Sequence, residues 1–469
     1  MDRLTGGSNL PSVRAMSITP AIDKTDLLRQ PLAAIRAVQD AKIGKQIALC
    51  ARGSKFYQRH WAAAGIDPTT IHTLADLERL PLTRKADLMD DPESFRLHCP
   101  DLPLHERALW EVNYTTGSTG DPTPLYVTTH DYQAYLFQAR RVAEISGVTD
   151  RDILANLFPL TAAPMGAFVR SASNAYAAGA AIVGALTGAR LGDFNVQRSL
   201  DDAIAMVERH RATILWGVTS YVRRVIIRAA ELNADFSSVR MCGVTGEAST
   251  PAMREDMRAR LRALGARGTV IFDRYGSTES GGFAQCHEDG DWHNPAPEVV
   301  FQEVVDPDTG RRLPDGERGA LAITHLDRRG TTLIRYLVGD IVSLAHEACP
   351  HCGRVGDRIV GPVIRTKDLL KVKGMLINPA VLFEAIRKVP EVDEFQVVLD
   401  RQNPTDPFSM DEMILRVASA ATDQTALAET LVRAAQTAVQ VRPRVVFEPA
   451  QAIYDPGAQV KAVRLVDRR

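Results

Sequence analysis

The stretch from residue 132 to residue 272 alternates short apolar runs with longer amphipathic segments. The runs typical of strands cover residues 153–157, 180–186, 213–218, 239–244 and 269–272. Helical periodicity marks segments before or between them, most clearly residues 132–145, 199–210 and 221–232. Such alternation predicts parallel sheets covered by helices on both faces, because parallel strands need crossover connections. We therefore expect an α/β fold.

Other regions of the 469-residue chain have different patterns, and the chain is too long for one ordinary core. Helices are expected from residue 24 to residue 90, and strands with turns from 297 to 345 suggest a barrel-like region. A compact α+β unit follows, with helices at 379–388 and 423–439 and strands at 394–399, 412–418 and 444–447. The expected domains are a flexible leader (1–23), a large domain (24–364) and a small C-terminal domain (365–469).

Charge and hydropathy argue against two classes of partner. The formal net charge is −1 with acids and bases mixed along the chain, whereas nucleic-acid-binding proteins normally carry a basic excess. The sequence has no run of about 18 apolar residues that could span a bilayer, and the first twenty residues lack the pattern of a secretory signal. We expect a cytoplasmic protein without nucleic-acid or membrane partners.

Residues 114–123, Tyr-Thr-Thr-Gly-Ser-Thr-Gly-Asp-Pro-Thr, form the most informative segment. Gly117 and Gly120 permit a sharp turn and a close approach to a ligand, while hydroxyl and backbone N–H groups can donate to phosphate oxygens. The spacing fits neither the Walker loop nor the dinucleotide fingerprint. Taken alone, the segment is consistent with a phosphate-binding loop or with a polar surface loop.

Two further loops directly follow expected strands. Gly246-Glu247 follows the strand that ends at Val244, and residues 273–279, Asp-Arg-Tyr-Gly-Ser-Thr-Glu, follow the next strand. The carboxyl ends of parallel strands meet at one edge of a sheet, where such sheets bind ligands. Further polar motifs are Leu-Ile-Arg-Tyr at 333–336, Gly339-Asp340, and Lys-Ala-Val-Arg at 461–464.

In this order the motifs resemble those of the adenylate-forming superfamily of acyl-CoA synthetases. The matching segments are Thr-Thr-Gly-Ser-Thr-Gly-Asp-Pro, Tyr-Gly-Ser-Thr-Glu, Ile-Arg-Tyr-x-x-Gly-Asp, Arg-Thr-Lys-Asp-Leu-Leu-Lys-Val-Lys-Gly and a near-terminal lysine. Cys-Pro-His-Cys-Gly-Arg at 349–354, Arg358-Ile359 and the closing Lys-Ala-Val-Arg-Leu-Val-Asp-Arg-Arg resemble the phenylacetate–CoA ligase group within it. The resemblance covers roughly residues 30–469 and implies a mobile C-terminal lid domain, ATP, Mg²⁺ and a carboxylic acid substrate.

The resemblance implies roles for individual residues. Tyr275 would stack on the adenine, and Asp340 would accept the ribose hydroxyls. Thr278 and Glu279 would be catalytic residues near the α-phosphate, with Glu279 a Mg²⁺ ligand. The residues implied to bind ATP or AMP are Thr115, Thr116, Gly117, Ser118, Thr119, Gly120, Gly246, Glu247, Asp273, Arg274, Tyr275, Gly276, Ser277, Asp340 and Arg354.

Two lysines are singled out by the same resemblance. Lys461 would be catalytic, because an ammonium between the substrate carboxylate and the α-phosphate stabilises charge in the transition state. The alternative is a solvated terminal lysine, since most lysines are exposed. Lys367 lies at the implied hinge, and an ordinary linker lysine is as consistent with the sequence.

Two features depart from the family pattern. Asp121 stands in the phosphate loop where many relatives carry lysine, which removes a positive charge beside the triphosphate. An additional stretch separates Arg358-Ile359 from Arg365, which affects the alignment of the hinge.

Cys349 and Cys352 have the spacing of a zinc knuckle, and Cys286 with His293 offers a second pair. Zinc takes sulfur and nitrogen ligands, so these four residues predict a closed structural zinc site. The alternatives are three reduced cysteines near one another by accident, or His287 or His351 as the nitrogen ligand.

Apolar and aromatic residues imply an acyl pocket by analogy with the family. The expected lining residues are Phe168, Trp216, Ser220, Tyr221 and Gly243, which would suit a small aromatic or cyclic acid. The aromatic side chains could instead belong to the core. Arg170 could pair with a substituent on the acid.

The implied function is ATP-dependent activation of a carboxylic acid, expected to be small and aromatic, with release of pyrophosphate and transfer of the acyl group to coenzyme A. The first alternative keeps the adenylation but uses a carrier-protein thiol or an amine as acceptor. The second is a nucleotide-binding protein without activity, against which the joint presence of Lys461, Glu279 and Asp340 argues. The resemblance alone leads us to expect a homodimer.

Overall fold

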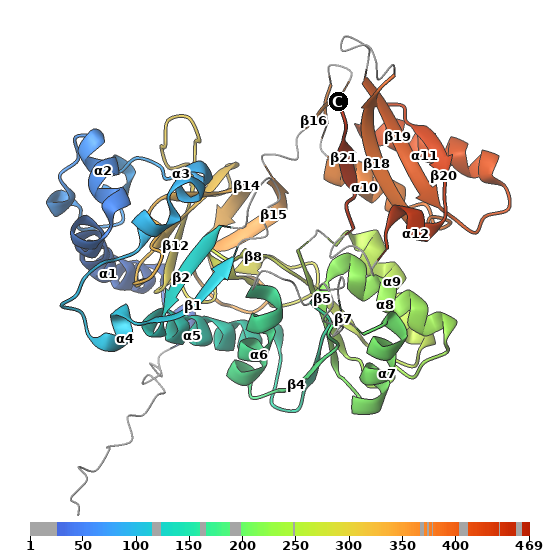
Figure 1. Cartoon of the computed structure of the whole chain (residues 1–469), viewed down its shortest axis with the longest axis horizontal. Coiled ribbons are helices and arrows are strands. Elements are labelled where there is room, and N and C mark those ends of the chain that lie inside the picture. The colour runs from blue at the N-terminus through green and yellow to red at the C-terminus, as the bar shows by residue number, and fades with distance from the viewer. Residues whose placement is uncertain are drawn as a thin grey trace, which may run out of the picture.

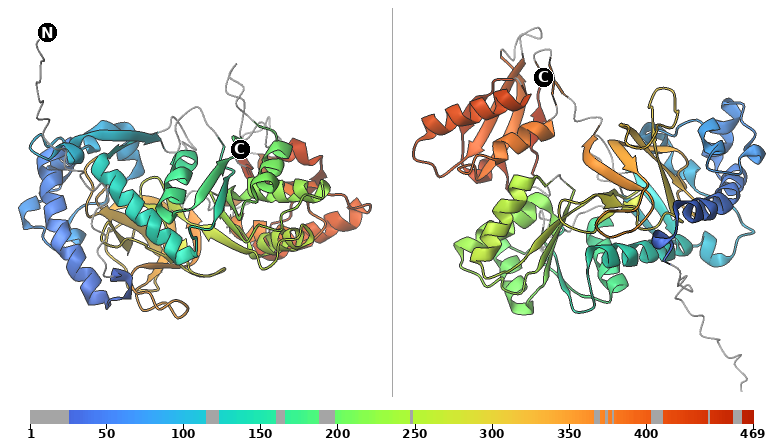
Figure 2. Two further views of the ribbon diagram at one scale, coloured as in Figure 1. Left: turned by 90° about the horizontal axis from the view of Figure 1, so that it is seen from below. Right: turned by 180° about the vertical axis from the view of Figure 1, so that it is seen from behind.

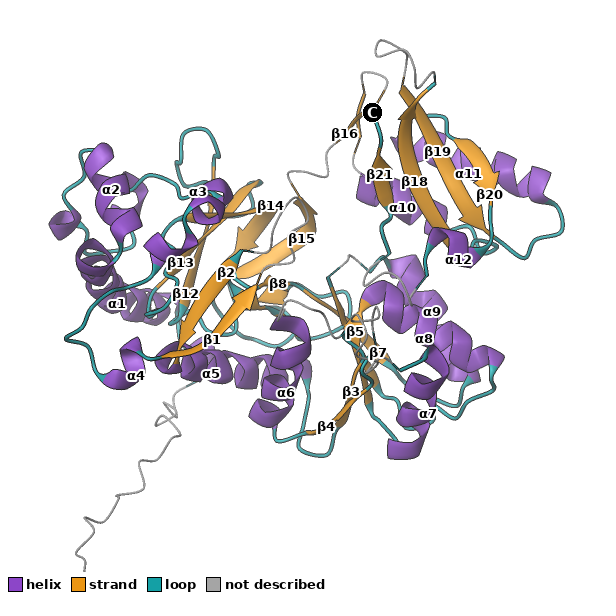
Figure 3. Ribbon diagram, in the orientation of Figure 1, coloured by secondary structure: helices purple, strands orange, loops and turns teal. Residues whose placement is uncertain are grey.

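The architecture combines parallel and antiparallel sheets with helices packed against them (Figures 1 and 3). A computed structural model describes residues 26–114, 123–159, 166–187, 198–246, 249–365, 370–372, 375–377, 379–402, 411–439, 441–455 and 462–469. Over these ranges, no helix combines the length and the apolar character that a membrane span requires.

A five-stranded parallel sheet forms from the apolar runs of the sequence. Its strand order is β4-β3-β5-β6-β7, with β3 at Ile153–Asn156, β4 at Ala181–Gly184, β5 at Ile214–Val218, β6 at Met241–Thr245 and β7 at Val270–Arg274. All neighbouring strands in it are parallel. The prediction of a parallel sheet in an α/β fold is confirmed.

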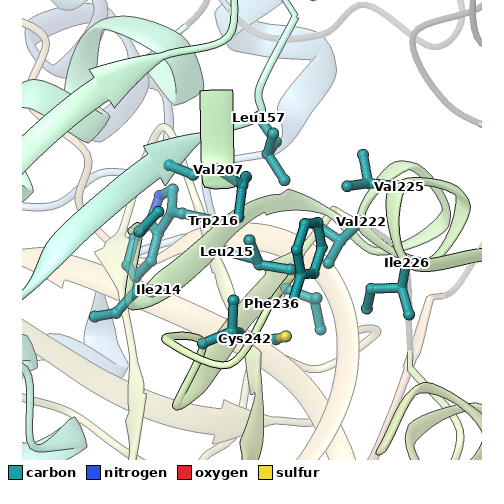
Figure 4. Close-up of a cluster of buried hydrophobic side chains, with 14 of the residues drawn as sticks. Leu157, Val207, Ile214, Leu215, Trp216, Val222, Val225, Ile226, Phe236 and Cys242 are labelled. Atoms are coloured by element: carbon teal, nitrogen blue, oxygen red, sulfur yellow. The ribbon is translucent and has the colours of Figure 1, made fainter. Parts of the chain in front are cut away.

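Helices cover both faces of the parallel sheet (Figures 1 and 2). α6 (Gly166–Ala178) lies on one face with α5 (Thr129–Ser146) packed against it, while α7 (Leu200–His210), α8 (Thr219–Glu231) and α9 (Pro251–Ala263) pack side by side on the other. Leu215, Val222 and Phe236 are among the buried side chains that fill the second layer (Figure 4). Burial on both faces explains why the strands read as continuous apolar runs.

The first turn of α5 is tied to a distant part of the chain. Thr128 and Asp131 form a capping box, in which each side chain accepts the backbone N–H of the other residue. The fully buried Asp131 carboxylate also accepts the backbone N–H groups of Arg329 at 2.8 Å and Gly330 at 2.7 Å. The cap of α5 therefore also holds the backbone of Arg329 and Gly330, which lie far along the sequence.

An antiparallel sheet forms the region that we expected to be barrel-like. Its order is β10-β11-β15-β14-β13-β12, with β10 at Ala284–Gln285, β11 at Trp292–His293, β12 at Val300–Val305, β13 at Gly319–His325, β14 at Tyr336–Ala345 and β15 at Arg358–Arg365. Within the described strands, β10 and β12 are opposite edges that do not pair, so the sheet is open rather than a closed barrel.

The N-terminal part packs on this antiparallel sheet. It contains α1 (Leu32–Gly53), α2 (Lys55–Ala63), α3 (Lys85–Asp90) and α4 (Leu104–Arg107), followed by the hairpin of β1 (Leu109–Tyr114) and β2 (Pro124–Thr128). Ile43 and Ile47 of α1 share a buried cluster with Val304 and Ile323 of the sheet. A short hairpin of β8 (Gly276–Ser277) and β9 (Gly281–Gly282) lies between the two large sheets in the sequence.

The C-terminal part folds around a core of its own. Its sheet has the order β20-β19-β18-β21, with β18 at Glu394–Arg401, β19 at Asp411–Ala418, β20 at Arg444–Phe447 and β21 at Leu465–Asp467. Helices α10 (Pro379–Arg387), α11 (Gln424–Val439) and α12 (Ala450–Ile453) accompany it, and β16 (Leu370–Val372) pairs with β17 (Met375–Ile377) before it. Ile386, Phe395, Leu415 and Leu431 belong to its separate buried cluster, and the sheet lies beside α8 and α9 (Figures 1 and 2).

A buried ion pair fastens the N-terminal segment to the antiparallel sheet. Arg335 and Glu303 have side chains that are 1% and 0% exposed, and Arg335 Nε lies 2.9 Å from Glu303 Oε1. The Arg335 guanidinium also donates to the carbonyl oxygen of Leu80 at 2.8 Å and to that of Gly310 at 2.6 Å. If either charge were removed, the other would be left buried without its counter-ion.

We predict that Glu303→Gln lowers the free energy of unfolding of this part by about 3–5 kcal/mol, because the buried Arg335 charge would lose its counter-ion. Thermal and denaturant melting followed by circular dichroism measures the change. Glu255→Gln, at a half-exposed position of α9, is the matched control and should melt close to the unsubstituted protein. Equal melting of both variants would contradict the structural role of the pair.

Candidate functional site

Tyr275 and Asp340 connect the two large sheets at the expected nucleotide-binding edge. Tyr275 directly follows β7, Asp340 lies on β14, and the Tyr275 hydroxyl donates to Asp340 Oδ2 at 2.6 Å. The Tyr275 ring lies against Phe283, with 5.4 Å between ring centroids, and Asp340 is 6% exposed. The two residues that the sequence assigned to adenine and ribose are therefore direct neighbours.

Glu279 is held in place by two buried groups. The Tyr336 hydroxyl donates to Glu279 Oε1 at 3.4 Å, and burial raises the pKa of Tyr336, so that hydroxyl keeps its proton. Burial lowers the pKa of His325 to about 3, so the neutral ring donates from Nε2 to the Glu279 carbonyl oxygen at 2.8 Å. His325 Nδ1 accepts the backbone N–H of Leu333 at 3.1 Å, which fixes this tautomer. The Glu279 carboxylate, 9% exposed, is oriented by hydrogen bonds at both its side chain and its backbone.

The loops at the carboxyl ends of β6 and β7 are bonded to each other. The Thr245 hydroxyl donates to the Arg274 carbonyl oxygen at 2.6 Å, and the backbone N–H of Ser249 donates to Asp273 Oδ2 at 3.1 Å. Burial raises the pKa of Asp273 to about 6. Gly246 has φ +83°, a conformation that L side chains rarely adopt. The Asp273 side chain thus holds the backbone of the loop that follows β6.

The short hairpin after Tyr275 holds three further residues of the predicted set. Gly276 and Ser277 form β8, and Ser277 Oγ lies 3.0 Å from Ser280 Oγ. A Cβ atom on Gly276 would lie 2.5 Å from the Gly281 carbonyl oxygen, so only glycine fits there. Thr278 lies in the turn of this hairpin, one residue before Glu279, and is partly buried.

Arg354 lies in the turn that holds Cys349 and Cys352, between β14 and β15. Its carbonyl oxygen accepts the backbone N–H of Cys349 at 2.8 Å. In the register of β14 and β15 the residue opposite Asp340 is Arg365, which we had treated only as part of the hinge motif. The signal that could have identified it is its position two residues before Lys367, at the end of the last long strand.

Several predicted residues lie outside the described ranges. They are Thr115, Thr116, Gly117, Ser118, Thr119 and Gly120 of the phosphate loop, together with Glu247, Lys367 and Lys461. The neighbour of Lys461 is described: the backbone N–H of Ala462 donates to Ser220 Oγ at 3.4 Å. Ser220 is in the first turn of α8, just beyond the carboxyl end of β5. The C-terminal segment therefore reaches the same edge of the parallel sheet as Tyr275.

The residues expected around the acyl group divide between core and edge. Tyr221 is 6% exposed, and burial raises its pKa to about 12. Phe168 packs against the same buried cluster from α6. Trp216 lies across Gly243, where a Cβ atom would be 2.7 Å from the indole ring. The interpretation of Tyr221 and Phe168 as core residues is thus as well supported as a lining role.

Arg170 already has a counter-ion. Its guanidinium forms an ion pair with Glu111 on β1, and it lies 4.0 Å from the centroid of the Tyr135 ring. The Tyr135 hydroxyl donates to Asn174 Oδ1 at 2.9 Å. The expectation that Arg170 pairs with a substrate substituent is therefore weakened, because Glu111 already neutralises its charge.

Cys286, His293, Cys349 and Cys352 converge on one point. Their ligand atoms all lie within 4.8 Å of one another. Cys286 Sγ lies 3.9 Å from Cys349 Sγ, and Cys352 Sγ lies 3.7 Å from His293 Nε2. Tetrahedral zinc with bonds of about 2.3 Å to sulfur places neighbouring sulfur atoms about 3.8 Å apart. The spacing and the donor types fit a closed Cys3His zinc site.

The protonation state of His293 suits a metal ligand, whereas that of Cys286 would do so only with a metal ion bound. Burial lowers the pKa of His293 to about 4, so its imidazole is neutral, as a metal ligand must be. Burial and the neighbouring sulfur atoms raise the pKa of the Cys286 thiol to about 12, and a divalent cation would reverse that effect. His287 and His351, the alternative nitrogen ligands, stack on each other with ring centroids 3.9 Å apart.

Comparison with known proteins agrees with this fold. The family model of the AMP-binding enzymes matches residues 58–326, more than half of the chain. The phenylacetate-coenzyme A ligase of Thermus thermophilus is 27% identical over 380 residues, which cover 80% of each chain. Among solved structures, 2-hydroxyisobutyryl-CoA ligase in the postadenylation state in complex with R3-HIB-AMP has a TM-score of 0.78 at 21% identity, covering 96% of this chain and 94% of that chain.

The same ligase in the thioesterification state, in complex with 2-HIB-AMP and CoA, has a TM-score of 0.60 at 22% identity, covering 94% of this chain and 91% of that chain. These two structures share the fold, and the whole-chain arrangement is nearer to the first. Because the family model spans more than half of the sequence, the chain belongs to the AMP-binding enzymes, the adenylate-forming superfamily, and within it is similar to the phenylacetate–CoA ligases.

Proposed function

We propose that the protein uses ATP to activate a carboxylic acid as an acyl-adenylate and then transfers the acyl group to coenzyme A. In the first step a carboxylate oxygen of the acid bonds to the α-phosphorus, the bond from that phosphorus to the β-bridging oxygen breaks, and pyrophosphate leaves. In the second step the CoA sulfur, whose proton passes to solvent, bonds to the acyl carbon, and AMP leaves. Both steps depend mainly on positioning and charge stabilisation.

The observation that carries the proposal is the convergence of Tyr275, Asp340 and Glu279 with the segment that follows Lys461. Tyr275 and Glu279 follow β7, Asp340 lies on β14 and the last segment belongs to the C-terminal unit, so three stretches far apart in the sequence contribute. The Ser220–Ala462 hydrogen bond supports a position for Lys461 close to the carboxyl edge of the parallel sheet. A nucleotide-binding protein without activity would not need an ammonium there.

Each group in this set has a role that its chemistry suits. Asp340 would accept the ribose hydroxyls, because a carboxylate has lone pairs beyond the one that Tyr275 uses. Glu279, oriented by Tyr336 and His325, would be a protein ligand of Mg²⁺, which when bound neutralises charge on the phosphates. Arg365 is a further candidate for this site beside Arg354, because Arg365 on β15 pairs with Asp340 on β14. Thr278 would lie beside the α-phosphate.

The substrate would be a small acid, with Trp216 and Gly243 beside it. Each lies two residues before the end of its strand, and the indole packs across the bare backbone of Gly243. Phenylacetate ligases with 27% identity to this chain support an aromatic acid. An acceptor other than CoA and a homodimer stay predictions from the resemblance.

The test of the function is ATP–pyrophosphate exchange that depends on an added carboxylic acid, measured without CoA over aromatic, cyclic and aliphatic acids. We expect exchange with some acids and none without acid, and CoA thioester when CoA is then added. Lys461→Ala should lower exchange by about 100- to 1,000-fold, as for other groups that stabilise the transition state.

Lys388→Ala is the matched control for this test, because Lys388 is an exposed lysine of the same unit that pairs only with Glu384. It should keep full activity. Exchange at the unsubstituted rate in Lys461→Ala would contradict the proposed mechanism, and no exchange with any acid would contradict the function.

We also propose that residues 365–469 form a domain that turns between the two half-reactions. Arg223 of α8 supports a defined contact in the present arrangement: its guanidinium donates to the Asp393 carbonyl oxygen at 2.8 Å and pairs with Asp256 of α9 at 2.9 Å. Asp393 immediately precedes β18 of the small sheet. This contact would have to break when the small domain turns.

Arg223→Ala should therefore slow adenylation more than it slows thioester formation from a supplied acyl-adenylate. We expect about a tenfold change in the ratio of the two rates, from the loss of one charge-assisted hydrogen bond. Arg224→Ala, at the next position of the helix, is the control. An equal loss in both half-reactions would argue against a contact specific to one arrangement.

A structural zinc ion bound by Cys286, His293, Cys349 and Cys352 is the second part of the proposal. It would join the end of the β10–β11 hairpin to the connection between β14 and β15. The Zn²⁺ charge would also favour three neighbouring thiolates that otherwise repel one another.

Elemental analysis of the purified protein should give one zinc per chain, and Cys349→Ser should lower this value and the melting temperature together. Cys99→Ser, which changes a buried cysteine outside the cluster, should leave the zinc content unchanged. Stably folded protein that contains no metal and does not gain stability from added Zn²⁺ would contradict the site.

A further inference from the structure

Arg274, the last residue of β7, forms no ion pair with a carboxylate in the described part of the chain, and the one titratable group that affects its charge there is Tyr135. Its guanidinium carbon lies 4.2 Å from the centroid of the Trp216 ring, and its side chain is only partly buried. The guanidinium has five N–H donors, and stacking on a ring covers its face but leaves those donors at its edge. These donors are not among the buried atoms that lack a partner, so they are open to solvent or to a ligand.

The sheet itself brings Trp216 and Arg274 together. Trp216 of β5, Gly243 of β6 and Phe272 of β7 are in register across three neighbouring strands. Residues two apart in a strand point to the same face, so Arg274 projects on the same side as Phe272. Because Gly243 has no side chain, the Trp216 indole crosses β6 and meets the guanidinium. Any larger residue at 243 would separate the two groups.

Among the residues that the structure describes, the surroundings of Arg274 supply aromatic rings but no unpaired carboxylate. Tyr135 of α5 lies close enough that Arg170 and Arg274 both oppose the effect of burial, which nevertheless raises the pKa of Tyr135 to about 12. Arg170 is paired with Glu111, so these three charged groups leave a net charge of +1. Burial lowers the pKa of Arg274 to about 10, which keeps it protonated at neutral pH.

The residues on either side of Arg274 face other partners. The Asp273 carboxylate accepts from the Ser249 backbone, and the Tyr275 hydroxyl donates to Asp340. Arg274 therefore lies against Trp216, on the side of the site proposed for the acyl group. Asp273 and Tyr275, its neighbours in the sequence, are hydrogen-bonded on the side proposed for the nucleotide. A cation kept beside an indole without a counter-ion is costly unless a ligand provides one.

We infer that Arg274 binds a second anionic group of the substrate, so that the acid activated here is a dicarboxylic acid or an acid with an equivalent negative substituent. This inference rests on the proposed adenylation. One carboxylate reacts with ATP, and the other lies against the Arg274 guanidinium, whose paired N–H groups match the geometry of a carboxylate. The Trp216 ring packs against the part of the molecule between them.

Exchange assays with matched acids test the inference. The pairs are phenylacetate and 4-carboxyphenylacetate, benzoate and terephthalate, and hexanoate and adipate, which differ within each pair by one carboxylate. We expect kcat/KM for the preferred diacid to exceed that for its partner by about 10- to 100-fold. Arg274→Gln should abolish this preference without changing the KM for ATP, and Arg274→Lys should keep part of it.

Arg140→Gln, at an exposed arginine of α5 that pairs with Glu144, is the matched control and should keep the preference. Monoacids that react as well as diacids would overturn the inference while leaving the adenylation intact, and this ratio needs only the unsubstituted protein. A raised KM for ATP with an unchanged acid preference in Arg274→Gln would also overturn it, because Arg274 would then bind phosphate. No exchange with any acid would reject the proposed function as well.

Discussion

Burial of the parallel sheet on both faces is the constraint on which the rest of the structure depends. Strands β3, β5, β6 and β7 can stay out of water only if α6, backed by α5, covers one face and α7, α8 and α9 cover the other. The edge at the carboxyl ends of the strands is then the part of the sheet where loops can meet a ligand. Tyr275, Glu279 and Ser220 all lie just beyond such strand ends.

Sequence reasoning located the secondary structure well because burial leaves a local periodic signal. The five parallel strands and the helices and strands of the C-terminal unit formed where apolar periodicity predicted them. It was less successful where pairing joins distant segments. The region after residue 297 closes no barrel, because nothing in the local pattern tells whether the two outer strands of a sheet will pair.

The same distinction explains the site. Asp340 and Tyr275 could be named from their motifs, but the hydrogen bond between them is a consequence of how two sheets meet. Arg354 could be named as a nucleotide ligand from its motif and stays a prediction, whereas only the pairing of β14 with β15 puts Arg365 opposite Asp340. Likewise, no sequence pattern distinguishes Arg170, neutralised by Glu111 on a distant strand, from Arg274, which pairs with no carboxylate in the described ranges. The role of a charged residue can be inferred only once its partners in the folded structure are known.

The hydrogen bond between Ala462 and Ser220 has a mechanical consequence. Ala462 lies three residues before β21, which is hydrogen-bonded to β18, so Ala462 is tied to the small sheet at one end and to α8 at the other. If the small domain turns as proposed, Ala462 would have to leave Ser220. Because Lys461 directly precedes Ala462 in the sequence, withdrawal of the lysine and opening of the site would then be one motion, with no separate signal needed to order them.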